Sequence, residues 1–450
     1  MAPHPGFRVR RFCFQAHESV APQRNLYSMP PFPPCPDGEI GRRARLRIWF
    51  RKECRFKSCS GYHFLFHPHL MTAPDSRAAS CLRLQTWDED AVIAAARELR
   101  AQSGGATIAF AWVSAGFRPH IRDFVEILQV EGHARCVVGC AADGLIGTGQ
   151  EEEGAEGFSV LFLNLPQAAV STWVIDSEFQ IPRGLRTDGC WLLIGNPARL
   201  DAQLLLEDMN RVYPGMPVYG GMAGGGWDAE SIFVFHSGHE AGQAAGIAVH
   251  LAGVKAGGIV SQGCQPIGEP YTITRAEENL IYAVGGRPAY EVLAETFESL
   301  TDAEKAAARG NIMAGLAATE YREEFRRGDF LVRNIIGGDP RSGAIKIGAL
   351  PRVGQTIQFQ LREKEAADED LRQQCVSEME KEGSPLAALL FSCGGRGQHL
   401  FGVPHHDAAV LADTFGRVPL AGFFANGEFG PVAGVNFIHG YTASAALIYP

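Results

Sequence analysis

The sequence predicts a mixed α/β fold, in which layered sheets are flanked by helices and strand–helix–strand units are repeated internally. Its 450 residues are 46% hydrophobic and 20% charged, an ordinary globular composition with enough length for two or three domains. Apolar runs of strand length alternate with stretches that have apolar residues at helical spacing, as in α/β proteins. One such unit also recurs three times along the chain.

The repeated unit is a strand, a helix, a second strand that leads into a glycine turn, and a third strand. The turn glycines Gly139, Gly220 and Gly422 follow the start of the first strand by 33, 30 and 35 residues, too long a period for a solenoid. The first copy is expected at 106–113, 121–130, 136–138 and 158–165, the second at 190–194, 201–212, 218–219 and 231–235, and the third at 387–391, 407–415, 419–421 and 442–449.

Further elements lie before the first copy and between the second and the third. An amphipathic helix at 88–100 carries acidic residues in its first turn, where they favour helix formation. Alternating patterns and turn residues predict paired strands at 245–251 and 258–262, hairpins of 271–274 with 280–284 and of 330–336 with 343–347, and a strand at 355–362. Helices are expected at 288–300 and at 363–382, the latter highly charged and exposed on one face.

Residues 1–70 differ from the rest, with 12 Lys and Arg against 4 Asp and Glu and little periodicity. We interpret them as a basic, disordered extension and leave three origins open: an upstream extension with Met71 as the true start, a transit peptide, or a small metal module. The last would use Cys54, Cys59 and His63, which partly resemble zinc-ligand spacing. A leader with the amphipathic helix follows at 71–103, and two domains are expected at 104–286 and 287–450.

Composition argues against several classes of function. Residues 71–450 carry 29 basic and 46 acidic side chains, so nucleic acid is not an expected partner. The eleven cysteines are an odd number and are scattered, which indicates reduced thiols in a cytoplasmic protein. Because no apolar run reaches about 18 residues, we expect no insertion into a membrane.

Two cysteines, Cys264 and Cys393, stand beside glycines at predicted strand ends. Each could be a nucleophile of a hydrolase if a histidine such as His236, His239 or His439 lay beside it. The alternative is that both are small buried thiols next to tight turns.

Arg396 follows a predicted strand in the sequence 392–397, which lacks the glycine spacing of a nucleotide-binding loop. Exposed backbone N–H groups and the guanidinium could hold a carboxylate there, or Arg396 could be a surface residue of a tight turn. Glu428 lies in an otherwise apolar strand end, so it is expected to pair with a cation such as Arg396 or to face a polar ligand. His439 and Thr442 could share that site.

His399, His405, His406 and Asp407 cluster within nine residues, but too few converging ligands are evident for a metal site. Asp407 is instead expected to be the N-cap of the following helix. The acidic residues Glu151, Glu152, Glu153 and Glu156 are expected in a solvated loop.

Two motifs carry a resemblance to a known family. They are the segment 263–270, followed by Asn279 and Pro288-Ala289, and the segment 391–397, followed by 419–424, Gly427-Glu428 and Thr442-Ala443. Both are similar to the FIST sensory domain, as an N-terminal and a C-terminal part that together extend from about Gly104 to Pro450.

The resemblance implies a sensory module without agreed catalytic residues that binds a small ligand, such as an amino acid or a derivative. A stand-alone member would signal through a separate protein, such as a kinase, a chemoreceptor or a cyclic-dinucleotide enzyme. Three alternatives stay open: a substrate adaptor, a Cys-dependent hydrolase, and a haem-binding nitric-oxide sensor. No cofactor is expected for the favoured function. Haem is the cofactor of the last alternative alone, and its candidate ligands are His236, His239, His250, His399, His405, His406 and His439.

The ligand pocket is predicted where the three glycine turns and the loop 263–268 converge at strand ends. Arg396 and Glu428 would hold the charged ends of a zwitterion. The remaining predicted lining residues are Gly263, Cys264, Gly268, Cys393, Gly422, Gly427 and Thr442.

Overall fold

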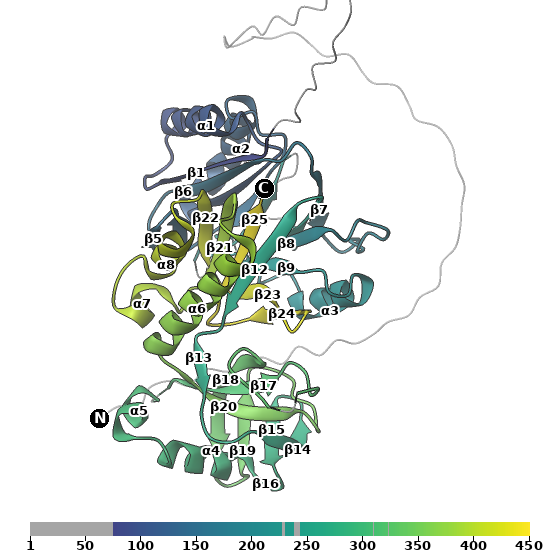
Figure 1. Cartoon of the computed structure of the whole chain (residues 1–450), viewed down its shortest axis with the longest axis vertical. Coiled ribbons are helices and arrows are strands. Elements are labelled where there is room, and N and C mark those ends of the chain that lie inside the picture. Colours follow the sequence, from purple (N-terminus) through teal and green to yellow (C-terminus); the bar gives the residue numbers. More distant parts are fainter. Residues whose placement is uncertain (1–74, 227–229, 238–243, 309, 323) are drawn as a thin grey trace, which may run out of the picture. The chain divides into compact units, whose positions relative to one another are not determined.

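Mixed sheets flanked by helices make up the computed structural model, as the sequence predicted (Figure 1). The structure describes residues 75–226, 230–237, 244–308, 310–322 and 324–450. The basic extension at 1–70, with its candidate metal ligands, lies outside the described residues, as does His239. In the described part, no helix is long and apolar enough to cross a membrane.

Three sheets each contain one copy of the repeat. The first has the order β1-β6-β2-β3-β10, the second β24-β23-β9-β8-β11-β7, and the third β12-β25-β21-β22-β4-β5. The first-sheet strands are β1 (Arg77–Arg83), β6 (Phe158–Asn164), β2 (Ile108–Val113), β3 (Val137–Ala141) and β10 (Val234–His236). The second-sheet strands are β24 (Val435–His439), β23 (Glu428–Val432), β9 (Val218–Met222), β8 (Gly189–Gly195), β11 (Gly246–Ala252) and β7 (Ala169–Ile175). The third-sheet strands are β12 (Lys255–Ser261), β25 (Ala443–Tyr449), β21 (Ala387–Cys393), β22 (Leu420–Ala425), β4 (Gly144–Gly147) and β5 (Gln150–Glu153).

The three copies share one topology. In each, the first strand pairs in parallel with the strand after the helix and antiparallel with the last strand: β2 with β3 and β6, β8 with β9 and β11, and β21 with β22 and β25. One predicted strand was wrong. Residues 231–235 contribute instead to β10, which pairs with β3 of the first sheet, and the last strand of the second copy is β11.

The repeat glycines lie inside strands rather than in turns. Gly139, Gly220 and Gly422 each sit opposite a residue of the parallel neighbour, and a Cβ added at any of them would overlap that residue's carbonyl oxygen. The glycine therefore permits a close backbone approach at the same point of each copy. The sequence pattern identified the three equivalent glycines, but it did not show that each one permits a close approach of two strands.

Alternate side chains of the three sheets point into one shared core. It includes Trp112 of the first sheet, Leu192 of the second and Phe423 of the third, all at most 1% exposed. The Trp112 and Phe423 rings lie 4.7 Å apart. Each copy is too small to bury both faces of its sheet alone, so this core joins the three copies.

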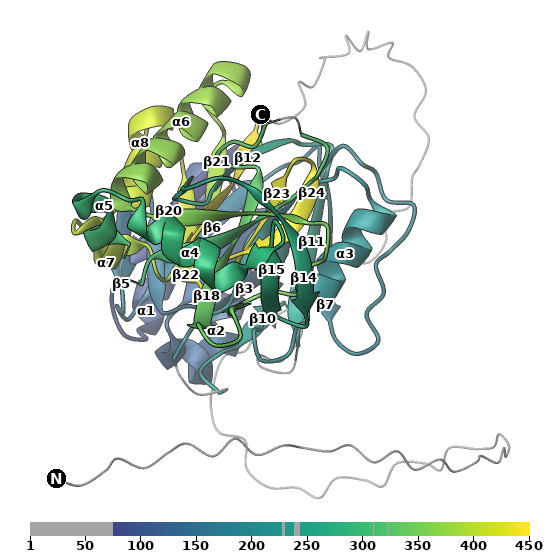
Figure 2. The ribbon, with the colours of Figure 1, turned by 90° about the horizontal axis from the view of Figure 1, so that it is seen from below.

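Helices cover the outer faces of the three sheets, on three different sides of the core (Figure 2). The first sheet carries α1 (Glu89–Ser103) and α2 (Ile121–Val130), which follows a short 3-10 helix at Ala115–His120. The second carries α3 (Ala202–Val212), and the third carries α6 (Lys364–Glu382), α7 (Gly397–Phe401) and α8 (His406–Phe415). Asp88 caps α1 by accepting from the Ala91 N–H. The inner face of α6 buries Leu371 and Cys375 and also the acidic Asp370 and Glu378, while most of its other charges are on the exposed face.

The fourth sheet has eight strands, its own apolar core and no copy of the repeat. It contains β13 (Cys264–Pro266), β14 (Tyr271–Glu277), β15 (Leu280–Val284), β16 (Arg287–Pro288), β17 (Ile312–Ala317), β18 (Phe330–Asp339), β19 (Ala344–Ile347) and β20 (Thr356–Arg362). The helices α4 (Ala289–Glu298) and α5 (Asp302–Ala307) belong to the same segment. Both predicted hairpins are confirmed, since β14 pairs with β15 and β18 with β19.

The segment 246–266 connects the repeat sheets to the fourth sheet. The predicted pairing of 245–251 with 258–262 was wrong, because β11 joins the second sheet and β12 pairs with β25 in the third. The chain then enters β13, which pairs with β20. Gln262 holds the junction: its side-chain amide donates to the carbonyl of Phe330 and accepts from the N–H of Val332.

Candidate functional site

Arg396 and Asp407 form a buried ion pair at the carboxyl end of the third-sheet strands. The Arg396 Nε donates to Asp407 Oδ2 at 2.7 Å and Nη2 donates to Oδ1 at 2.9 Å, with both side chains at most 1% exposed. The hydroxyl of Ser392 also donates to Oδ2, and the His406 ring contacts Oδ1. Burial alone would raise the pKa of Asp407, but the Arg396 charge and these hydrogen bonds hold it below its ordinary value.

This pair changes the role expected for Asp407. Its carboxylate does not cap α8; the side chain of Glu151 does so from β5, where Oε1 accepts from the Ala408 N–H at 2.8 Å. The prediction of a solvated acidic loop was therefore wrong for Glu151, which is 5% exposed. Burial, followed by the charge of Asp407, raises the pKa of Glu151 to about 8.

Glu428 lies at the start of β23 and is fully buried. Its Oε2 accepts from the Thr442 N–H at 3.2 Å, while Oε1 has no hydrogen-bond partner. In the part of the chain that the structure describes, no cation lies within ion-pairing distance of Glu428, so it is not the partner of Arg396. Burial raises the pKa of Glu428 well above its ordinary value, which favours a neutral carboxyl group.

The two candidate nucleophiles are poorly ionised thiols. Burial raises the pKa of Cys264 to about 12. Burial, the main cause, also raises the pKa of Cys393 to about 12. Cys264 packs against Met313, Val332 and Tyr441. A reactive cysteine needs a lowered pKa, so this environment fits the buried-thiol interpretation.

Another arginine, Arg362, was not singled out in the sequence, and its side chain contacts Tyr441 and Gly395. Its guanidinium lies 4.2 Å from the ring centre of Tyr441, and Nη2 donates to the carbonyl of Gly395. It joins β20 of the fourth sheet to the loop before Arg396.

The structure brings together most, but not all, of the predicted site residues. A Cβ added to Gly263, whose φ is +63°, would lie 2.8 Å from Arg396 Nη1, so this glycine permits the buried arginine. Gly427 precedes Glu428, and its carbonyl accepts from the Met222 N–H. Gly422 lies within β22. Gly268 lies apart, in the fourth sheet, where its carbonyl accepts from Gln358.

A pocket of about 430 Å³ opens where the ends of the three repeat copies meet. Asp143 and Gly144 come from the first copy, Gly226 from the second, and Gly394, Phe424 and Asn426 from the third; Glu153 and Gly154 complete the lining. The ends of the three copies meet here, but none of the nine ligand-binding residues predicted from the sequence lines the pocket. The loop 263–268 is not part of the lining either, and Arg396 is fully buried.

The pocket carries negative charge. Asp143 and Glu153 are both exposed, no Lys or Arg is among the residues that line it, and neither carboxylate forms an ion pair within the described residues. Glu153 Oε1 accepts from the Gln398 N–H at 2.6 Å, which fixes this carboxylate at the start of α7. The sequence analysis placed Glu153 in a solvated loop and did not single out Asp143, which comes two residues after β3. The arrangement suits a ligand that donates hydrogen bonds or carries positive charge.

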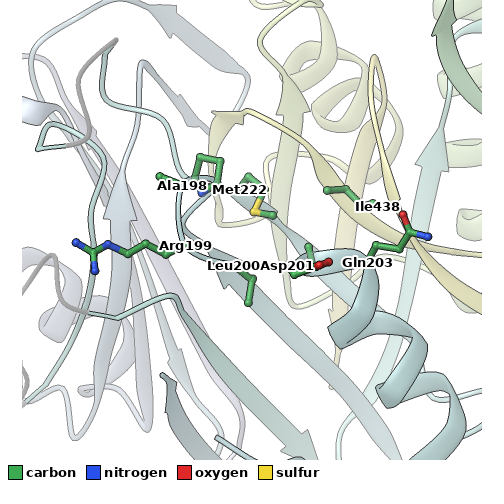
Figure 3. Close-up of a pocket in the computed structure, with 9 residues that line it drawn as sticks. Ala198, Arg199, Leu200, Asp201, Gln203, Met222 and Ile438 are labelled. Atoms are coloured by element: carbon green, nitrogen blue, oxygen red, sulfur yellow. The ribbon is translucent and has the colours of Figure 1, made fainter. Parts of the chain in front are cut away.

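A second pocket, of about 540 Å³, lies at the start of α3 in the second copy (Figure 3). It is lined by 197–203, Met222 and Ile438. In Figure 3, Arg199 extends away from Met222, while Gln203 and Ile438 lie on the other side of the pocket. The side chain of Asp201 is the N-cap of α3 and accepts a hydrogen bond from the Leu204 N–H.

The candidate haem-ligating histidines lie on different elements. His250 Nε2 contacts the carbonyl of Arg186, His439 Nε2 contacts that of Gly430, and His406 lies between Asp368 and Asp407. His236 contacts Thr172, His405 contacts the backbone of Glu151, and His399 is exposed. Among the residues that the structure describes, no group of three or more His, Cys, Asp or Glu side chains could hold a metal ion.

Comparison with models of protein families identifies the family to which the chain belongs. A FIST N domain model matches residues 107–287, and a FIST C domain model matches residues 289–431. The chain belongs to the FIST family. The resemblance seen in the sequence is therefore confirmed, and FIST domains are recognised as small-ligand sensory domains of signalling proteins. The two FIST matches share a sheet, since β4 of the first pairs with β22 of the second.

Relatives of this FIST protein occur in mycobacteria. It is 36% identical over 388 residues to an uncharacterized protein of Mycobacterium tuberculosis (strain ATCC 25618 / H37Rv), covering 84% of this chain and 97% of the relative. An uncharacterized protein of Mycobacterium bovis is 34% identical over 390 residues, covering 84% and 96%.

Proposed function

We propose that this FIST protein is a non-enzymatic, cytoplasmic sensor whose ligand is a small amine, such as an amino acid or a derivative. The ligand binds in the pocket at the strand ends, with its ammonium group between Asp143 and Glu153. The observation that carries the proposal is the pairing of these two unneutralised carboxylates in one pocket with the amide of Asn426 and the ring of Phe424.

The size and the place of the pocket support this function. A volume of about 430 Å³ lies within the roughly 300–1,000 Å³ range of small-molecule sites. Strand ends of α/β sheets are the usual position of such sites. Because all three copies contribute to the lining, a ligand there contacts each of them and favours the arrangement that closes around it.

The chemistry of the thiols supports binding rather than catalysis. Hydrolysis by Cys264 or Cys393 would need a thiolate near neutral pH, whereas burial raises the pKa of both to about 12. The proposal includes no cofactor. The sensor would act through a separate signalling protein, such as a kinase, a chemoreceptor or a cyclic-dinucleotide enzyme, and purification from its native source would identify that partner.

Thermal denaturation in the presence of individual amino acids and polyamines tests the proposal. A ligand at about 100 times its Kd adds about 2.7 kcal/mol to the free energy of unfolding, a shift that is easily measured. The variants Asp143→Asn and Glu153→Gln should each weaken binding about tenfold or more, because each removes one charge and keeps an oxygen acceptor.

The matched control is Glu152→Gln, a neighbour on β5 that does not line the pocket, which should leave binding unchanged. If no amine shifts the unfolding curve, or if both pocket variants bind as the wild type does, the amine site is wrong. A partner that purifies with the protein without any small ligand would then favour the adaptor alternative.

A further inference from the structure

A third pocket lies between the second sheet and the fourth sheet, away from the three glycine-rich strand ends. It has a volume of about 590 Å³ and is lined by residues of α3, β24, β17, β18 and the loop after β19. Its apolar walls include Leu206, Leu316, Leu331 and Phe437. Leu350 and Val435, also in the lining, are 68% and 40% exposed, so apolar surface continues to the mouth.

Arg333 brings an uncompensated positive charge into this pocket. Its Nη1 donates to the Val332 carbonyl at 2.8 Å and its Nη2 to the Ile438 carbonyl at 2.9 Å, which holds the guanidinium in place. Among the described residues, no carboxylate lies within ion-pairing distance of it. Burial lowers the pKa of Arg333 to about 10, so the side chain remains charged at neutral pH.

The contrast with Arg396 shows why this charge points to a ligand. Arg396 is fully buried and has the carboxylate of Asp407 as its counter-charge, whereas Arg333 is half-buried at the wall of the pocket and has no such partner among the described residues. A guanidinium has five N–H donors, and within the described residues two carbonyls accept from Arg333, so further N–H donors are available to a ligand in the pocket. A desolvated charge is costly unless it is paired.

The other polar groups of the pocket are compatible with an anion. Arg352 adds a second, exposed cation to the lining. Glu207 is the carboxylate among the lining residues, and it accepts from Gln203 on the exposed side of α3 rather than from either arginine. An anionic head group would meet Arg333, while an apolar body would cover the leucine walls.

We propose that this pocket binds an amphipathic anion, a carboxylate or phosphate head group on an unbranched apolar chain of about ten carbons. The head group is held by Arg333, assisted by Arg352, and the chain lies along Leu206, Leu316 and Leu331. The site is separate from the amine pocket and does not depend on it.

Isothermal titration calorimetry of the full-length protein tests this with four ten-carbon probes: decanoate, decyl phosphate, decanol and decylamine, each below its micellar concentration. We expect the two anions to bind at least tenfold more tightly than decanol, and decylamine not to bind. Comparison of decanoate with decyl phosphate identifies the preferred head group. Equal binding of decanoate and decanol, or no binding of either anion at 1 mM, roughly the weak limit of useful affinity, would overturn the proposal.

Variants assign the binding to this pocket. Arg333→Met should weaken decanoate at least tenfold and leave decanol unchanged. Because Arg333 also holds two backbone carbonyls, Arg352→Glu provides a second variant at an exposed position, and it should weaken decanoate without altering the fold. The matched control is Arg341→Glu, an exposed arginine outside the pocket. If decanoate binds Arg333→Met and Arg352→Glu as tightly as the wild type, the anion lies elsewhere and the assignment is wrong.

Discussion

Arg396 and Asp407 meet in a two-pronged ion pair with both side chains buried, although eleven positions separate them in the sequence. The pair joins the loop after β21 to the first turn of α8. That loop also supplies Gly394 to the pocket of about 430 Å³, whose lining does not include Arg396 or Asp407, so the pair supports one wall of the pocket from outside it.

The first prediction is that Asp407→Asn lowers the free energy of unfolding by about 3–5 kcal/mol, because it leaves the Arg396 charge buried without a partner. Urea denaturation at pH 7 measures the change. The control is Glu291→Gln, which removes an exposed partner of Arg287 and should cost less than about 1 kcal/mol. A cost below 1 kcal/mol for Asp407→Asn would mean that water reaches Arg396.

The second prediction concerns the pH dependence of stability. Glu151 has a folded-state pKa of about 8 against an ordinary value of 4.5, so the folded state keeps a proton that the unfolded chain releases. Stability from this group is therefore fully present below about pH 4.5 and is lost as the pH rises toward 8. The loss is on the order of a few kcal/mol, at 1.36 kcal/mol per unit of pKa shift.

Glu151→Gln removes this titration and keeps an oxygen acceptor for the Ala408 N–H. The variant should gain stability relative to the wild type as the pH increases from 5 to 8, measured by urea denaturation at each pH. Glu152→Gln, on the same strand, should not alter the profile. Parallel profiles of Glu151→Gln and the wild type would show that Glu151 is ionised in the folded state.

The repeat and the fold class could be predicted because they rest on local patterns. Apolar spacing and strand-end glycines identified the first two strands and the helix of every copy. Pairing between copies was not predictable in the same way, since it depends on contacts between distant segments. The placement of 231–235 beside β3, and of β12 beside β25, follows from the shared core rather than from any local signal.

For the site residues, too, local sequence patterns were informative, whereas contacts between residues far apart in the sequence could not be predicted. Sequence reasoning selected Glu428 as an unusual charge in apolar surroundings, and it is buried, whereas the interpretation of Arg396 as a surface residue of a tight turn was wrong, since Arg396 is buried too. The partner of Arg396 was not predicted, because Asp407 looked like a helix cap, whereas Thr442 was expected near Glu428 and contacts it through its backbone N–H. Asp143 and Glu153 looked like ordinary surface acids, and only the folded arrangement brings them into one pocket. The ligand-binding roles of the nine residues named from the sequence stay predictions.

The third prediction tests the equivalence of the three repeat glycines. Gly139→Ala, Gly220→Ala and Gly422→Ala should each lower the free energy of unfolding by about 3 kcal/mol or more, because the added methyl group overlaps a carbonyl oxygen of the paired strand. Gly337→Ala is the matched control: it lies in strand β18 with nothing within 4 Å of an added Cβ. Denaturant titration of the four variants measures the difference. If one repeat variant has the same free energy of unfolding as Gly337→Ala, the close approach of the two strands does not contribute to stability in that copy.

The fourth prediction is that Cys264 and Cys393 resist alkylation in the folded protein. With a pKa of about 12, each thiol is ionised at neutral pH roughly a thousandfold less than a free cysteine of pKa about 8.5. Iodoacetamide labelling followed by peptide mass spectrometry measures the rate at each cysteine between pH 6 and 9. Both should react at least a hundredfold more slowly than in urea-unfolded protein, where the same thiols serve as their own control.

The two cysteines differ in a way that sharpens this test. Cys264 is 2% exposed, whereas Cys393 is half-buried and accepts from the Gly395 N–H through its sulfur. Access alone would therefore make Cys393 react faster, and only its raised pKa would keep it slow. Rapid labelling of Cys393 with an apparent pKa below 7 would contradict this assignment and favour a thiol-dependent reaction. Slow labelling that increases steadily up to pH 9 would show that burial keeps the thiol protonated.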